Sequence, residues 1–241
     1  MKVIRIILDY LLRLLSWLPL GFHYACCGIL AFVMKNVMRY RRDVVVTNIS
    51  RSFPEMKYKE IRKTVSKFYS HLGEVIAEAI LPYGSKDIIV AYKPLSSKVW
   101  DYVMRRNRCA AVLRENYQGY IPNQEILRYA LAHRSENKIY IFPNDQYPYS
   151  AAKSYSTLEF LNQETKVMKC GAALAHKVGM SVVYMNMRAL SRGRYNQEYT
   201  LICEDASLME PDEIMKRYFS LLEKDIQQTP WNYLWSHKRW K

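Results

Sequence analysis

The chain has 241 residues, half of them hydrophobic, and its 36 lysines and arginines outnumber its 22 aspartates and glutamates, giving a net charge of +14. The length suffices for a domain with its own core, and the charge favours a polyanionic partner such as nucleic acid, anionic lipid or an acidic protein. The sequence contains no RNP, KH, helix-turn-helix or zinc-finger pattern, and its five cysteines include no C-x-x-C pair. Nucleic acid is therefore disfavoured as a partner, and a zinc site or disulfide framework is not expected.

An apolar stretch over 14–34 contains no Asp, Glu, Lys or Arg and is about as long as a helix that crosses a bilayer. Pro19 predicts a break near its start. The residues before it carry a narrow polar stripe at helical spacing, formed by Lys2, Arg5, Asp9 and Arg13. Such a stripe is typical of a helix in the membrane interface. We predict a membrane-anchoring helical segment over 1–42 that includes an apolar membrane helix; the alternative is a buried helical hairpin in a soluble core.

The remainder, 43–241, is predicted to form one α/β domain. Helical spacing of apolar residues predicts a helix over 59–81, and an apolar run predicts a buried strand over 88–92. Further helices are expected after Ser97 and after Asn123.

A second strand is predicted within 138–148, and it is followed by Asn144, Asp145 and Gln146. Ligands commonly bind at the carboxyl ends of strands in α/β sheets, so Asp145 is a candidate for function. The alternative is that Asp145 and Gln146 form a turn that caps its own backbone.

In the last third of the sequence, the residue pattern predicts a turn-rich loop over 158–165 and a helix over 166–179 with Gly179 at its C-terminal cap. It then predicts a β-hairpin over 181–205 and a helix over 211–228. Strands separated by helices, with a hairpin near the end, indicate an α/β fold with a mixed sheet flanked by helices.

The final eleven residues, WNYLWSHKRWK, place three tryptophans among basic residues. This tail resembles the C-terminus of the bacterial late acyltransferases of lipid A biosynthesis, the lauroyl/myristoyl transferase family, which commonly end in W-L-W-S-H-R-R-W-K. Other stretches are similar to that family in the same order, namely RRDVVVTNISRSFPE, KFYSHLGEVIAEAI, AYKPLSSKVWDYVM, IFPNDQYP and VVYMNMRALSRGRY. The resemblance spans nearly the whole chain.

The resemblance implies a glycerolphosphate-acyltransferase-like fold, bound to the bacterial inner membrane with its catalytic domain on the cytoplasmic side. It implies transfer of a fatty acyl chain from acyl carrier protein to a hydroxyl of a lipid A precursor or related phosphorylated glycolipid, with no metal or organic cofactor. The implied partners are acyl carrier protein, the glycolipid acceptor and an anionic membrane, with no nucleic acid. Matching positions predict a set of substrate-binding residues, which are Lys93, Asp145, Gln146, Arg188, Arg239 and Trp240.

The family's catalytic signature, H-x4-[DE], supplies a histidine base and an acid that orients it. None of the five histidines of this chain has an Asp or Glu five residues further on, so no catalytic residue is assigned. In the family the motif lies between the segments matched by EVIAEAI and YKPL, which predicts an internal deletion near 87–91. His71 with Glu78, or Asp145, are weak substitutes for the base. A catalytically inactive relative that binds membrane or carrier protein is therefore the alternative function.

Overall fold

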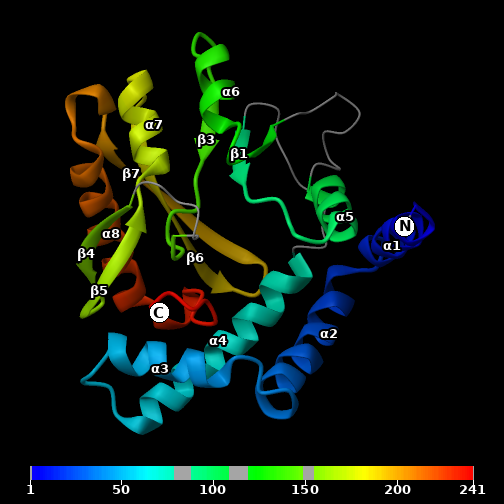
Figure 1. Cartoon of the computed structure of the whole chain (residues 1–241). Coiled ribbons are helices and arrows are strands. Elements are labelled where there is room, and N and C mark those ends of the chain that lie inside the picture. The colour runs from blue at the N-terminus through cyan, green and yellow to red at the C-terminus, as the bar shows by residue number, and fades with distance from the viewer. Residues whose placement is uncertain (1, 79–87, 109–118, 149–154, 241) are drawn as a thin grey trace. The chain divides into compact units, whose positions relative to one another are not determined.

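The computed structural model describes residues 2–78, 88–108, 119–148 and 155–240, and its course is drawn in Figure 1. The chain divides into two compact units, each made of two segments. Unit 1 comprises Met1–Cys27 and Val75–Pro143, and unit 2 comprises Gly28–Glu74 and Asn144–Lys241. The domain boundary at residue 42 stays a prediction, and so does the deletion, part of which falls on residues 79–87, outside the described ranges.

Unit 1 contains a three-stranded parallel sheet with β1 (Ile88–Tyr92) at its centre. Its neighbours are β2 (Tyr120–Pro122) and β3 (Ile139–Ile141), which pair with β1 in the registers Val90 to Tyr120 and Ile88 to Ile139. The predicted strand over 88–92 is confirmed. Helices α5 (Lys98–Arg108) and α6 (Ile126–Ala132) confirm the helices expected after Ser97 and Asn123, and the Ser97 hydroxyl accepts from the Trp100 amide at 3.4 Å.

The N-terminal residues form α1 (Lys2–Ser16) and α2 (Leu20–Phe32), the latter continued by a π-helical turn over Val33–Val37. The break predicted at Pro19 within the apolar stretch over 14–34 is confirmed, because α1 ends at Ser16 and α2 begins at Leu20. Within the described ranges, no single helix has both the length and the apolar character to cross a membrane. One pair of neighbouring helical segments reaches that length and composition when taken together, namely Gly21–Val37 with Arg42–Ser52. The axes of these two segments are bent by 86° relative to each other. The membrane helix is thus unconfirmed.

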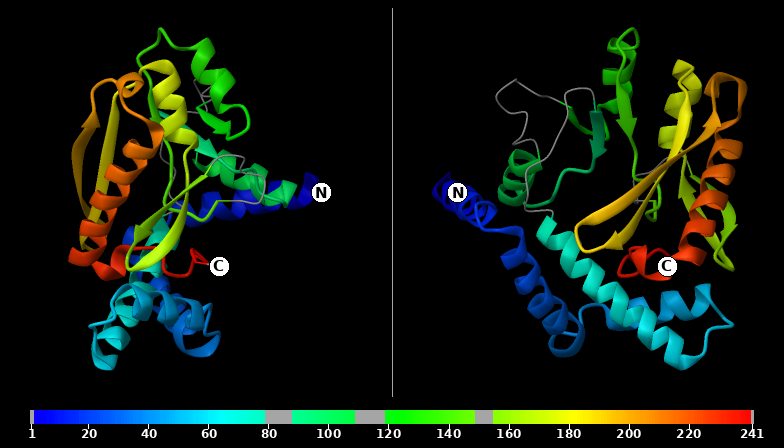
Figure 2. Two further views of the ribbon diagram at one scale, coloured as in Figure 1. Left: turned by 60° about the vertical axis from the view of Figure 1, so that its left-hand side comes forward. Right: turned by 180° about the vertical axis from the view of Figure 1, so that it is seen from behind.

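Unit 2 holds the larger hydrophobic core, to which buried residues from helices and strands contribute. Its helices are α3 (Arg42–Ser52), α4 (Tyr58–Glu78, whose last residues belong to unit 1), α7 (Cys170–Val178) and α8 (Pro211–Gln228), with short 3-10 turns over Ala206–Leu208 and Pro230–Asn232. α8 packs against α7 and against β4, β6 and β7, as both views in Figure 2 also show. The predicted helices over 59–81 and 211–228 are confirmed where the structure describes them.

The strands of unit 2 form two separate antiparallel hairpins. These are β4 (Tyr155–Phe160) with β5 (Gln163–Met168), and β6 (Val182–Ser191) with β7 (Arg194–Cys203). The hairpin predicted over 181–205 is confirmed. The α/β class is confirmed too, but in the described part of the chain parallel and antiparallel strands lie in three small sheets rather than in one mixed sheet.

The loop predicted over 158–165 is wrong, because these residues belong to the β4–β5 hairpin. Its two-residue turn places Leu161 and Asn162 at φ values of 52° and 60°, the left-handed region that a tight hairpin turn requires. Asn tolerates that conformation, whereas Leu161 adopts it while buried in the core. The helix predicted over 166–179 consequently begins only at Cys170. Its predicted C-terminal cap, Gly179, has φ 71°.

Candidate functional site

The C-terminal tail of unit 2 is buried against α3. Asn48 on α3 donates from its side-chain amide to the carbonyl oxygens of Trp235 at 2.9 Å and His237 at 3.0 Å. Arg41, just before α3, donates to the Ser236 carbonyl at 3.0 Å. Trp235 is fully buried, and its indole N–H donates to the Pro230 carbonyl. Three polar contacts, two from Asn48 on α3 and one from Arg41 before it, thus fix the backbone of the tail.

Arg239 places a guanidinium inside the protein, with 1% of the residue exposed. Its Nη1 donates to the Lys166 carbonyl at 2.7 Å, and its charge lies 5.6 Å from the ring centre of Phe219. Among the described residues, its Nε and Nη2 are buried without a hydrogen-bond partner of standard geometry, while the Tyr233 hydroxyl lies close enough to act on the guanidinium. Burial lowers the pKa of Arg239, as expected for a cation removed from water. A buried guanidinium whose Nε and Nη2 make no bond of standard geometry to the described residues is suited to holding an acceptor atom.

Asp145 is a carboxylate whose charge acts on Arg239, and its side chain is half-buried. Burial raises the pKa of its carboxyl group, and the positive charge of Arg239 opposes that rise. The Asp145 backbone carbonyl accepts from the Tyr233 hydroxyl at 3.2 Å. Burial also raises the pKa values of Tyr218 and Tyr233, with the charge of Asp145 as the next cause. These four residues form one buried polar cluster, which we call the Asp145–Arg239 cluster.

Trp240 anchors the end of the tail beside this cluster. Its indole N–H donates to the hydroxyl of the buried Thr165 at 2.8 Å, and its ring stacks on Phe160 with the centres 6.3 Å apart. These contacts give Trp240 a packing role in the folded unit.

The remaining predicted site residues are placed differently. Gln146 is exposed next to Asp145 in the chain. Arg188 on β6 donates to the Gln228 side chain at 2.9 Å, which ties β6 to the end of α8. Lys93 is exposed directly after β1 in unit 1. The structure therefore brings Asp145, Arg239 and Trp240 into one region of unit 2, and the substrate-binding role of all six residues stays a prediction.

Sequence reasoning missed the tyrosines of this region. Tyr184 on β6 donates to the Asp225 carboxylate of α8 at 2.5 Å, and burial raises its pKa. Tyr218 belongs to α8, and its ring meets that of Tyr184 edge to face, with the ring centres 5.4 Å apart. Tyr233 lies within the tail motif itself, which was the one signal that could have identified it. The others are ordinary strand and helix residues until the fold brings them together.

Two of the histidines, His133 and His176, direct a ring nitrogen at backbone carbonyl oxygens. His176 directs Nδ1 at the carbonyl oxygens of Ala206 and Met209, at 2.9 and 3.0 Å, and His133 directs Nδ1 at the Tyr129 carbonyl. Glu74, one turn after His71, pairs with Arg192 at 2.8 Å. The side chain of Glu78 lies outside the described set, so its pairing with His71 stays untested. No group of three metal-ligating side chains occurs within the described ranges.

A family model described as bacterial lipid A biosynthesis acyltransferase matches residues 103–241. That match covers more than half of the chain and includes the whole Asp145–Arg239 cluster. The match places the chain in an acyltransferase class. More particularly, the chain belongs to the bacterial lipid A biosynthesis acyltransferase family. No curated protein matches the chain.

Proposed function

We propose that the protein is a membrane-bound acyltransferase of lipid metabolism. It transfers a fatty acyl chain from acyl carrier protein to a hydroxyl of a lipid A precursor or related phosphorylated glycolipid, at the cytoplasmic face of the bacterial inner membrane. The observation that carries this proposal is the family match over 103–241, which contains the buried Asp145–Arg239 cluster.

Membrane attachment is supported by the exposed apolar face of α1. Its side chains at spacings of three and four are between 49% and 60% exposed, and they are Ile4, Ile7, Leu11 and Leu14. In the sequence, the polar residues of this stretch recur at helical spacing out of phase with these apolar positions. Trp17 follows the helix and is 84% exposed, which suits the headgroup region of a bilayer.

The charge of the chain supports both proposed substrates. A net charge of +14 attracts an acidic carrier protein and a phosphorylated lipid, and it also favours an anionic membrane surface. A cluster with a buried guanidinium gives one position where a polar group of the acceptor can be held. We propose that Asp145 and Arg239 contact the acceptor, with Lys93, Gln146 and Arg188 as further contacts.

The second candidate is a non-catalytic relative that binds membrane and carrier protein. The specific observation in its favour is that no histidine is followed five residues later by an acid. Loss of a general base typically lowers a rate by about two to four powers of ten. The acyltransferase and the non-catalytic relative therefore differ in whether they transfer acyl chains, whereas both bind membrane and carrier protein.

The test is acyl transfer by the purified full chain in mixed detergent and phospholipid micelles. Radiolabelled acyl carrier protein is the donor, phosphorylated glycolipids and aminolipids are offered as acceptors, and products are separated by chromatography. The proposal predicts transfer above a protein-free control, at a rate about two to four powers of ten below that of a relative with the histidine motif. Absence of labelled product with every acceptor, while carrier protein still binds, would instead establish the non-catalytic relative.

A further inference from the structure

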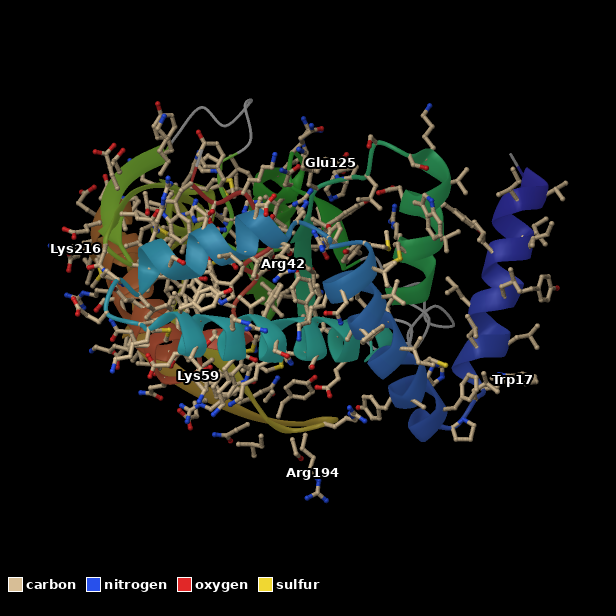
Figure 3. All side chains as sticks on the ribbon, turned by 90° about the horizontal axis from the view of Figure 1, so that it is seen from below. Trp17, Arg42, Lys59, Glu125, Arg194 and Lys216 are labelled. Atoms are coloured by element: carbon tan, nitrogen blue, oxygen red, sulfur yellow. The ribbon has the colours of Figure 1, made fainter. Side chains whose placement is uncertain are left out.

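Helix α4 has one face of cations that no ion pair among the described residues neutralises. Lys59, Arg62 and Lys63 lie at spacings of three and four, and Lys67 follows one turn later; all are exposed. Figure 3 marks Lys59 on the first turns of α4. The row from Lys59 to Lys67 extends over about 12 Å at the usual rise of a helix. We name these four residues the α4 basic face.

The contacts of this face leave its charge uncompensated. Arg62 lies over the Tyr58 ring at 5.8 Å, and Lys67 lies over the Trp231 ring at 3.8 Å. Across the described residues, no member of the face forms an ion pair with a carboxylate. Glu60, the acid within the row, accepts from the Lys57 backbone amide at 2.8 Å. Like charges at these spacings repel one another, so an anionic partner would relieve that repulsion.

The opposite side of α4 holds the basic face in a fixed position. Val65, Phe68 and Tyr69 are at most 5% exposed and belong to the core of unit 2. The Tyr69 hydroxyl donates to the Tyr40 carbonyl at 2.7 Å. A surface already fixed in its bound geometry loses little entropy when a partner docks.

The chemistry of the face favours a protein over a bilayer. Between Tyr58 and Glu74, the exposed large apolar side chain is that of Tyr58, and no aliphatic side chain of this stretch is among the exposed large ones. A bilayer surface rewards buried apolar area, which α1 offers and this face lacks. A compact row of cations matches a row of carboxylates on one acidic helix, where complementary charge sets the rate and specificity of docking.

We propose that the α4 basic face docks an acidic helix of the acyl carrier protein. The identity of the partner rests on the proposed function, whereas the acidic chemistry of the partner rests on the face itself. The docking would hold the carrier protein against unit 2, the unit that also contains the Asp145–Arg239 cluster.

The test measures binding of acyl carrier protein to the full chain in detergent micelles, by fluorescence anisotropy of the labelled carrier protein over a range of salt concentrations. The variant is Lys59→Glu with Lys63→Glu. The control is Lys216→Glu with Lys224→Glu, which makes the same change of charge on two exposed lysines of α8. We expect the α4 variant to raise the Kd roughly tenfold or more and to flatten its salt dependence, with little change in the control.

Equal weakening in both variants would overturn the proposal, because net charge alone would then explain binding. Unchanged carrier binding by the α4 variant would also overturn it, and loss of binding to phosphatidylglycerol vesicles in that variant would assign the face to lipid instead. Helical circular dichroism of both variants excludes misfolding as the cause. If the unaltered protein binds no carrier protein, both the docking proposal and the donor of the proposed function are overturned, whereas the outcomes above overturn the docking proposal alone.

Discussion

Helices α1 and α4 are both amphipathic, yet they use their apolar faces in opposite ways. The apolar side of α4 is buried in unit 2 through Val65, Phe68 and Tyr69, while Ile4, Ile7, Leu11 and Leu14 of α1 remain about half exposed. An apolar stripe at helical spacing therefore does not reveal whether it will meet protein or lipid. The difference lies in what the rest of the chain provides: the tail, α8 and the hairpins supply a core for α4.

The largest effect should come from charging the exposed face of α1. Ile7→Asp with Leu14→Asp removes two side chains that would enter the membrane, each worth about 1.5–3 kcal/mol of burial. Cosedimentation with phosphatidylglycerol vesicles should fall by a hundredfold or more on that estimate. Leu208→Asp is the matched control, since Leu208 is exposed on a short turn of unit 2. Equal losses in both variants would show that α1 has no special role in lipid binding.

A core substitution in α4 should mainly change stability. Phe68→Ala removes a buried ring and should lower the free energy of unfolding by about 3–5 kcal/mol. Leu11→Ala in α1 should change it by less than about 0.5 kcal/mol, because that side chain is already exposed. Chemical denaturation in detergent, followed by tryptophan fluorescence, compares the two. A similar shift of both midpoints would mean that the exposed face of α1 is covered by protein.

The contact between α3 and the tail should have an intermediate effect. Asn48→Ala leaves the carbonyls of Trp235 and His237 without their donor, at a cost of about 1–3 kcal/mol. Asn36→Ala is the control, because Asn36 makes an exposed hydrogen bond to the Phe32 carbonyl. Thermal unfolding that responds alike to both substitutions would argue against a buried anchoring role for Asn48.

The smallest effect concerns the turn of the β6–β7 hairpin. Arg192 pairs with Glu74 on α4 at 2.8 Å, and the arginine side chain is largely exposed. Arg192→Gln should therefore cost less than about 1 kcal/mol, and the loss should shrink as salt is raised. A cost of several kcal/mol in the same unfolding experiment would indicate that the hairpin depends on this pair for its position.

The elements with strong local signals were predictable from the sequence. The strand over 88–92, the break at Pro19, the cap at Gly179 and the helix over 211–228 each rest on composition or on a proline or glycine whose effect is local. The β4–β5 hairpin was missed because Leu161 adopts a left-handed turn conformation that its side chain does not favour. Packing of the Leu161 side chain in the core determines the conformation of this turn.

The candidate site was only partly predictable for the same reason. Asp145 was identified from its place after a strand, and Arg239 and Trp240 from the tail motif. Tyr184 and Tyr218 have no motif, and their role in the polar surroundings of Asp145 arises from packing between β6 and α8. Burial of a charge is a property of the assembled unit, so no spacing in the sequence could reveal that Arg239 lies inside it.

The central claim is that the exposed apolar face of α1 contacts lipid, with Trp17 at the membrane surface. The most direct measurement is quenching of Trp17 by phospholipids brominated at different depths, obtained as the difference between the unaltered protein and Trp17→Phe. We expect Trp17 to be quenched by bromines close to the headgroups, because an interfacial helix enters only about 5–10 Å into the bilayer. A Trp17 signal that no brominated lipid quenches would contradict the claim.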